Sequence, residues 1–209
     1  LQRHATREVH VGLVGKYDLQ DAYKSIRESL NLAGIYNEVK VKIHFINSEE
    51  VTADNVAQKL EGMAGVLICP GFGTRGIEGK IIAAQYTRTH DIPTFGICLG
   101  MQMMVIEFAR NVLGYADANS KEMDAETPHN VIDIMESQKN ITNMGGTMRL
   151  GAYKCNLLAD SRVAEIYGSS EISERHRPRY EFNNTYIDEY EAHGMKCTGR
   201  NPESDLVEI

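Results

Sequence analysis

The sequence has no apolar run that approaches the roughly 20 residues needed to cross a bilayer. Its first ten residues, LQRHATREVH, also lack the apolar core of a secretory signal. No sign of charge dominates, because the net charge is −7 over 209 residues and acidic and basic residues are mixed along the chain. This balance argues against a general binder of nucleic acid or of membrane surfaces. We therefore expect a cytoplasmic protein whose ligands are small molecules.

Cysteine is scarce, and the spacing of the cysteines argues against a metal site. The four cysteines lie far apart at positions 69, 98, 155 and 197, with no CxxC pair. This spacing fits neither a zinc site nor the disulfide framework of a small secreted domain. We expect four free thiols and no metal site.

The first half of the chain alternates between short apolar runs and helical patterns. Strands are expected over residues 10–15, 39–45, 65–69 and 92–97, and helices over residues 21–33, 48–60, 77–90 and 99–111. Gly34 is expected to end the first helix, and Ser48 to cap the second. Four strands alternating with four helices predict a doubly wound α/β fold, in which helices flank a mostly parallel sheet.

After residue 120 the pattern loosens into additional short C-terminal strands. These are expected over residues 131–135, 148–150 and 172–182. No composition shift marks a convincing second-domain boundary, so one domain is expected.

Cys98 is expected where the fourth strand turns into the fourth helix, within GICLG at residues 96–100. The G-x-C-x-G pattern is similar to the nucleophile elbow, in which small flanking residues permit a sharp turn that exposes the nucleophile. The N-terminus of the following helix would favour a thiolate. A cysteine between Ile97 and Leu99 can equally be a small buried apolar residue. The residues alone leave both interpretations open.

The segment PTFGICLGMQ, residues 93–102, resembles the nucleophile segment of class I, triad-type, glutamine amidotransferase domains. Other segments narrow the resemblance to the glutaminase domains of CTP synthases: GLVGKY, DAYKSI, GFGTRGIEGK, ANSKE, GGTMRLG and ERHRPRYEFNN. Of these segments, GGTMRLG and ERHRPRYE point specifically to CTP synthases. The resemblance covers nearly the whole chain and implies a flavodoxin-like amidotransferase domain over residues 9–209. It also implies that residues 1–8 are the connector from an N-terminal synthetase domain.

The resemblance further implies a role for each matching residue. Cys98 would attack the side-chain amide of glutamine, and the backbone N–H groups of Gly71 and Leu99 would hold the oxyanion. The substrate-binding residues would be Gly71, Phe72, Leu99, Gln102, Glu122 and Arg179, with Glu122 on the ammonium and Arg179 on the carboxylate of glutamine. Where the family usually has P-G-G-F-G, this chain has Pro70 in place of the first glycine. Gly71 keeps the N–H donor that the family uses.

Two motifs invite other interpretations. GFGTRG at residues 71–76 matches G-x-G-x-x-G, and Asp91 lies beyond it. A dinucleotide site needs its acid at the end of the next strand, where this chain has Cys98, so we disfavour that interpretation.

The basic run ERHRPRYE could be mistaken for a nucleic-acid patch, but Glu174 and Glu181 bracket it. A continuous strand would place Arg175, Arg177 and Arg179 on one face as a local anion site. We assign no role to Arg175 or Arg177.

The general base is the missing part of the implied site. In the family an H-P-E motif supplies the histidine and its carboxylate, but none of the seven histidines here precedes Pro-Glu. Asn201-Pro202-Glu203 is a near match on the wrong side of the DLVEI segment. We therefore expect the base and its glutamate to lie outside these residues, and the chain alone to be a poor glutaminase.

The resemblance implies L-glutamine as substrate and no cofactor in this domain. For the full-length enzyme it implies ATP, magnesium and UTP in the synthetase domain, GTP as activator, and a homotetramer. Two alternatives stay open. One is an amidotransferase or γ-glutamyl hydrolase with another acceptor, and the other is a non-catalytic amidotransferase-like module that serves regulation or assembly.

Overall fold

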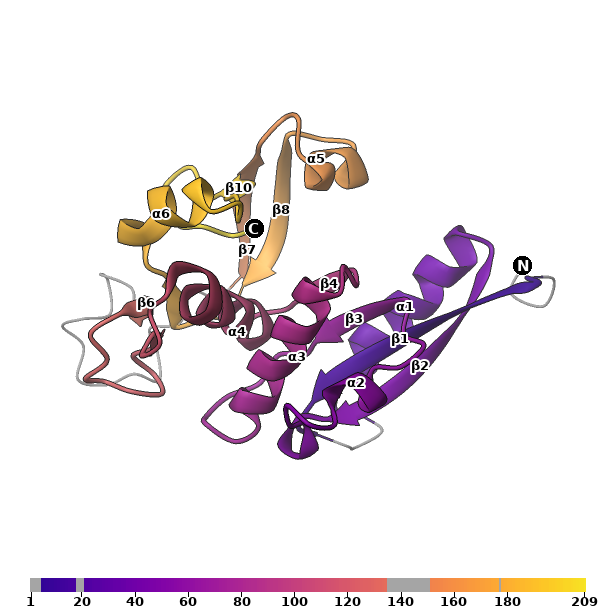
Figure 1. Cartoon of the computed structure of the whole chain (residues 1–209). Coiled ribbons are helices and arrows are strands. Elements are labelled where there is room, and N and C mark those ends of the chain that lie inside the picture. Colours follow the sequence, from indigo (N-terminus) through magenta and orange to yellow (C-terminus); the bar gives the residue numbers. More distant parts are fainter. Residues whose placement is uncertain (1–4, 18–20, 135–150, 177) are drawn as a thin grey trace. The chain divides into compact units, whose positions relative to one another are not determined.

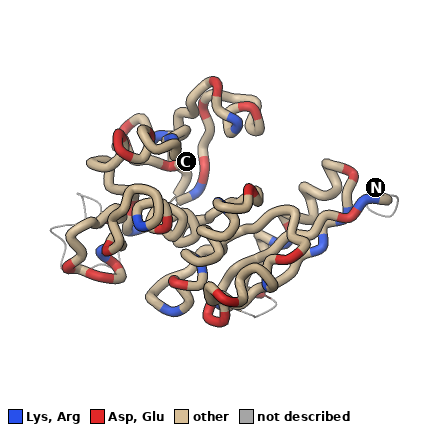
Figure 2. The backbone as a smooth tube through the Cα atoms, viewed as in Figure 1, with Lys and Arg blue, Asp and Glu red and all other residues tan. Residues whose placement is uncertain are grey.

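The computed structural model describes residues 5–17, 21–134, 151–176 and 178–209. The chain divides into two compact units, Leu1–Glu107 and Phe108–Ile209 (Figure 1). Acidic and basic residues are interspersed along the described parts of both units (Figure 2). Within these described ranges, no helix is both long enough and apolar enough to cross a membrane.

The first unit is built on a four-stranded parallel sheet with the order β2-β1-β3-β4. The strands are β1 (Arg7–Gly15), β2 (Val39–Asn47), β3 (Gly65–Ile68) and β4 (Thr94–Gly96). The expected α/β class and parallel sheet are confirmed. Because β2 and β3 lie on opposite sides of β1, the direction of winding reverses between β1 and β3. Ligands of open α/β sheets bind at such a switch point, beyond the carboxyl ends of the strands.

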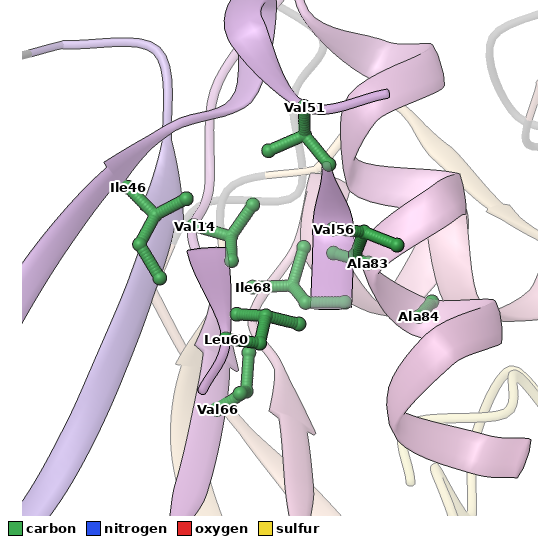
Figure 3. Packing of buried hydrophobic residues seen from close by; sticks show 9 residues of the cluster. All are labelled: Val14, Ile46, Val51, Val56, Leu60, Val66, Ile68, Ala83 and Ala84. Carbon is green, nitrogen blue, oxygen red and sulfur yellow. The ribbon is translucent and has the colours of Figure 1, made fainter. Parts of the chain in front are cut away.

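Helices cover both faces of this sheet. The helices are α1 (Lys24–Tyr36), α2 (Val56–Lys59), α3 (Ile77–Thr89) and α4 (Leu99–Phe108). On one face, residues of α2 and α3 pack on the strands, as in the cluster of Val56, Leu60 and Ala83 with Val14 and Ile68 (Figure 3). On the other face, Ile26 and Leu30 of α1 pack against Leu13 and Leu67. Alternating strand residues therefore bury both faces of the sheet, as its continuous apolar strands predict.

Two expected helix boundaries are wrong. Gly34 does not end the first helix, because it is a buried residue inside α1. A Cβ at Gly34 would lie 2.8 Å from Cγ2 of Val41 and 2.9 Å from the Val39 carbonyl oxygen, so glycine is required by close packing against β2. Ser48 does not cap a long helix either. Asn47 caps the short 3-10 helix η2 (Ser48–Glu50), and α2 covers only Val56–Lys59.

The second unit contains two small three-stranded sheets with the orders β5-β6-β9 and β10-β7-β8. The first comprises β5 (Asn119–Ser120), β6 (Asn130–Ile134) and β9 (Tyr180–Phe182), and the second β7 (Gly151–Leu157), β8 (Glu171–His176) and β10 (Gly199–Arg200). Between strands lie α5 (Arg162–Tyr167), the 3-10 helix η6 (Asn184–Tyr186) and α6 (Ile187–Ala192), and the unit begins near the π-helical turn η3 (Ala109–Leu113).

The strand expected over residues 172–182 is wrong as one element. It is two strands, β8 and β9, which belong to different sheets. Arg175 and Arg179 therefore do not share the face of one strand, and Arg177 lies outside the described residues. The strand expected over residues 148–150 lies outside them too.

Candidate active site

Cys98 lies at the sharp turn between β4 and α4. Its φ is +54°, in the left-handed region that non-glycine residues rarely adopt, and its side chain is exposed. The interpretation of Cys98 as a small buried apolar residue is therefore wrong. The flanking glycines make this turn possible. A Cβ at Gly96 would lie 2.6 Å from the backbone of Gly100, and a Cβ at Gly100 would overlap the carbonyl oxygen of Ile68.

The turn that follows β3 lies beside this elbow. The N–H of Ile97 donates to the Ile68 carbonyl oxygen at 3.1 Å, which ties the approach to Cys98 to the end of β3. Three residues further along, Gly71 reaches the start of α4, since a Cβ there would lie 3.5 Å from Cδ2 of Leu99. Gly71 and Leu99, which were expected to supply the oxyanion donors, are thus neighbours.

Two expected pocket residues flank these positions. Gln102 is 4% exposed, and its N–H donates to the Cys98 carbonyl oxygen at 3.1 Å in the first turn of the helix. Phe72 is 56% exposed, so that its ring is accessible to a ligand.

Two lysines that the sequence interpretation did not single out meet at the same place. Lys80 is completely buried, and its Nζ donates to the Cys69 carbonyl oxygen at 2.6 Å. Lys16, which follows β1, is 6% exposed, and its Nζ donates to the Phe72 carbonyl oxygen. Both lie within motifs quoted above, GLVGKY and GFGTRGIEGK. The available signal was a lysine in the apolar stripe of a helix, because Lys80 shares helical spacing with Ile77, Ile81 and Ala84.

Burial changes the ionisation of groups around this turn. It lowers the pKa of Lys80 to about 8, and electrostatic interactions with Cys69, Lys16 and Cys98 modify this effect. Burial also raises the pKa of the Cys69 thiol to about 12, with the nearby Lys80 acting in the opposite direction. Cys69 is therefore a neutral thiol at pH 7, and all four cysteines are free, as expected.

The second unit brings Glu122 and Arg179 near one tyrosine. The pKa of Tyr180 is raised, first by burial and then by the Glu122 carboxylate, while Arg179 lowers it. The sheet explains this meeting. Glu122 follows β5, Arg179 precedes β9, and both strands pair with β6. An acid and an arginine in one neighbourhood provide complementary groups for an ammonium and a carboxylate.

Two sequence motifs have structural explanations. The loop GFGTRG leads to Gly76, the residue before α3, and Arg75 Nη1 binds Oε2 of Glu49 at 2.7 Å. Asp91 follows α3, before β4, and so does not end a strand.

In the near-match to H-P-E, Asn201 Oδ1 accepts the N–H groups of Glu203 at 3.0 Å and Ser204 at 2.8 Å. Asn201 therefore stabilises a turn.

Comparisons with known proteins agree with this geometry. The family "Glutamine amidotransferase class-I" matches residues 18–209. The chain is 70% identical over 211 residues to a CTP synthase of Bacteroides thetaiotaomicron and 59% identical over 202 residues to one of Flavobacterium johnsoniae. These matches cover 100% and 96% of this chain, but only 39% and 38% of the relatives.

A solved structure is also similar over nearly the whole chain. The glutaminase domain of Trypanosoma brucei CTPS with bound acivicin has a TM-score of 0.88 and 38% sequence identity. The similarity covers 95% of this chain and 78% of that one.

Proposed function

Because this chain belongs to the class-I glutamine amidotransferase family, and within it to the glutaminase domains of CTP synthases, we propose that Cys98 removes the side-chain nitrogen of L-glutamine. The observation that carries the proposal is the placement of Cys98. Its exposed thiol sits on a strained elbow at the N-terminus of α4, where the helix dipole favours a thiolate.

The first half of the reaction forms a thioester. The Cys98 thiolate attacks the side-chain amide carbon, and the carbonyl oxygen takes the negative charge. The N–H groups of Gly71 and Leu99 donate to this oxyanion, which stabilises the tetrahedral intermediate. The C–N bond then breaks, the nitrogen accepts a proton, and ammonia leaves. Water attacks the glutamyl thioester, which releases glutamate and restores the thiol.

Proton transfer requires a group that first gives a proton to the leaving nitrogen and then removes one from water. A histidine oriented by a carboxylate performs both steps. Since no histidine of the sequence precedes Pro-Glu, we propose that the full-length enzyme supplies this pair.

Recognition of glutamine is assigned by charge. Glu122 binds its α-ammonium group, Arg179 binds its α-carboxylate, and Phe72 and Gln102 contact its side chain. The shared influence of Glu122 and Arg179 on Tyr180 supports the pairing of these two charges.

We infer the fate of the ammonia from the relatives. The chain spans 39% of the CTP synthase from Bacteroides thetaiotaomicron. We propose that the remaining part of the full-length enzyme is an N-terminal synthetase domain, which uses ATP and magnesium to activate UTP and receives the ammonia to form CTP. Activation by GTP, assembly into a homotetramer and a cytoplasmic location belong to the same proposal.

Labelling by acivicin, the compound bound in the Trypanosoma brucei domain, tests the nucleophile. The protein expressed from its complete gene is incubated with acivicin and digested, and the peptides are analysed by mass spectrometry. We expect an adduct on Cys98, none in the Cys98→Ser variant, and unchanged labelling in a Cys197→Ser control. A wild-type protein without an adduct on Cys98 contradicts the proposal and favours a non-catalytic module.

Product analysis tests the acceptor. With glutamine, ATP, magnesium and UTP, the full-length protein is expected to form CTP. With the same ATP, magnesium and UTP, Cys98→Ser should form CTP when ammonium chloride is the nitrogen source but not when glutamine is. Glutamate release without any CTP from either nitrogen source would instead favour an amidotransferase or γ-glutamyl hydrolase with another acceptor.

A further inference from the structure

Two lysine ammonium groups lie inside the first unit, at the carboxyl ends of its central strands. Lys16 directly follows β1, and Lys80 lies on the buried side of α3. Lys80 is the largest fully buried side chain of the described residues, and Lys16 is only 6% exposed. Burial of an ammonium group costs several kcal/mol unless hydrogen bonds compensate it, so each lysine needs acceptors at these positions.

Both ammonium groups bind the same four-residue turn, Cys69–Phe72. Lys80 Nζ donates to the carbonyl oxygen of Cys69 at 2.6 Å, and Lys16 Nζ donates to the carbonyl oxygen of Phe72. The lysines also approach the middle of the turn. A Cβ at Gly71 would lie 3.2 Å from Cε of Lys16 and 3.7 Å from Nζ of Lys80.

The turn needs such support because of its own sequence. Pro70 offers no N–H to a hydrogen-bond network, and Gly71 and Gly73 give the backbone wide conformational freedom. The N–H of Gly71 belongs to the peptide bond between Pro70 and Gly71, which lies between the two carbonyl groups that the lysines bind. Holding both ends of the turn therefore restricts the directions that this N–H can take. An oxyanion donor is effective only if it is already aimed at the developing charge.

Lys80 also places positive charge near the nucleophile. Lys80 interacts electrostatically with Cys98 and with Lys16, and the remaining partner, Cys69, is neutral at pH 7. A positive charge near Cys98 favours its thiolate and the oxyanion that forms from it. Hydrogen bonding and charge therefore act in the same direction.

We infer that Lys16 and Lys80 are positioning residues for glutamine hydrolysis, which lock the Cys69–Phe72 turn so that the Gly71 N–H faces the oxyanion. The inference rests on the function proposed above and adds residues that act through the backbone. A purely structural role is the competing explanation, and it predicts a loss of stability without a loss of turnover in the folded protein.

Methionine substitutions separate these explanations, because methionine keeps most of the lysine volume and removes the donor and the charge. The protein expressed from its complete gene is compared with Lys80→Met, Lys16→Met and the surface control Lys59→Met. Glutamate release is measured for kcat and KM, and thermal unfolding is recorded for each variant. We expect kcat to fall about 10- to 100-fold in Lys80→Met and Lys16→Met, with KM changed less than about 3-fold, as for a misplaced catalytic group. Lys59→Met should match the wild type.

A pH profile supplies the readout that a structural role would not change. Because Lys80 loses its proton near pH 8, the wild-type kcat should contain a decrease above that pH which Lys80→Met lacks. The inference is overturned if folded Lys80→Met keeps kcat within about 2-fold of the wild type, or if both proteins have the same pH profile. These results are distinct from failure of the proposed function, which would appear as wild-type protein without acivicin labelling at Cys98.

Discussion

Gly100 packs directly against the carbonyl oxygen of Ile68, so that a Cβ at position 100 would overlap this oxygen. The first turn of α4 therefore lies against the end of β3, and this contact brings Cys98 and Leu99 to the turn that contains Gly71.

Substitution Gly100→Ala should displace α4 from β3. We expect a loss of about 2–4 kcal/mol in the free energy of unfolding, because the clash is with backbone rather than with a flexible side chain. Glutaminase activity of the remaining folded protein should fall at least 10-fold, because the elbow shifts. Urea unfolding and glutamate release measure the two effects. The control is Gly65→Ala, where the new Cβ has its nearest neighbour, the Pro93 oxygen, at 3.5 Å. Equal losses in the two variants would refute the packing argument.

Arg179→Met should weaken glutamine binding. Removal of a charged partner of the substrate carboxylate is expected to raise KM about 10- to 100-fold, since a charge-assisted hydrogen bond contributes about 1.5–3 kcal/mol. Steady-state glutaminase assays on the full-length protein give KM. Arg175→Met is the matched control, because Arg175 lies on β8 in the other sheet. A KM change of the same size in Arg175→Met would mean that Arg179 has no special role.

Arg88→Met should destabilise the first unit. Arg88 donates from Nε and Nη2 to both carboxylate oxygens of Glu107, whose side chain is 2% exposed. Loss of the guanidinium leaves a buried carboxylate without this partner. Since Arg88 is itself one-third exposed, we expect the free energy of unfolding to fall by about 2–3 kcal/mol. This is less than the loss for a fully buried pair. In the more exposed pair of Lys59 and Glu50, Lys59→Met should cost less than 1 kcal/mol. Chemical denaturation checks both values, and similar losses would exclude a special role for burial.

The buried Cys69 thiol should contribute less to stability at alkaline pH than at neutral pH. Its folded pKa of about 12 lies above the ordinary value of 9.0, so between these values the folded state holds a proton that the unfolded state releases. The contribution of Cys69 to the free energy of unfolding therefore decreases as the pH rises through this range, so that Cys69→Ala should gain stability relative to the wild type over the same range. Lys80 acts oppositely between about pH 8 and 10.5, because its folded pKa is lowered. Denaturation of the wild type and of Cys69→Ala at pH 8.5 and 10.5 tests the difference. Parallel curves for wild type and Cys69→Ala would contradict it.

Local patterns predicted the parts of the fold that depend on local chemistry. The run at residues 65–69 became β3, and the helical spacing at 77–90 became α3, each within one residue. The strand-to-helix turn at Cys98 could be predicted from its apolar run and its flanking glycines, but whether its thiol is exposed or buried could not. The exposure of Cys98 then excluded the interpretation as a small buried residue, which the sequence had left open.

Features that depend on distant contacts could not be predicted in this way. Gly34 resembles a helix end, and only its packing against β2 explains why the helix continues. The apolar spacing around Lys80 indicates a buried helix face, but only the structure shows that the Cys69 carbonyl accepts from its ammonium group. The division after Glu107 falls where α4 passes into a π-helical turn, and no polar linker marks it. The roles of Gly71, Leu99, Glu122 and Arg179 come from resemblance and remain predictions.

The left-handed backbone of Cys98 has a consequence for how this sequence tolerates change. A non-glycine residue in that conformation costs about 1 kcal/mol, so the fold would accept glycine or asparagine at position 98 at least as well as cysteine. Selection for stability alone would therefore replace the reactive residue. A screen for heat-resistant variants should therefore recover such substitutions, and these proteins should be inactive if Cys98 is the nucleophile proposed above.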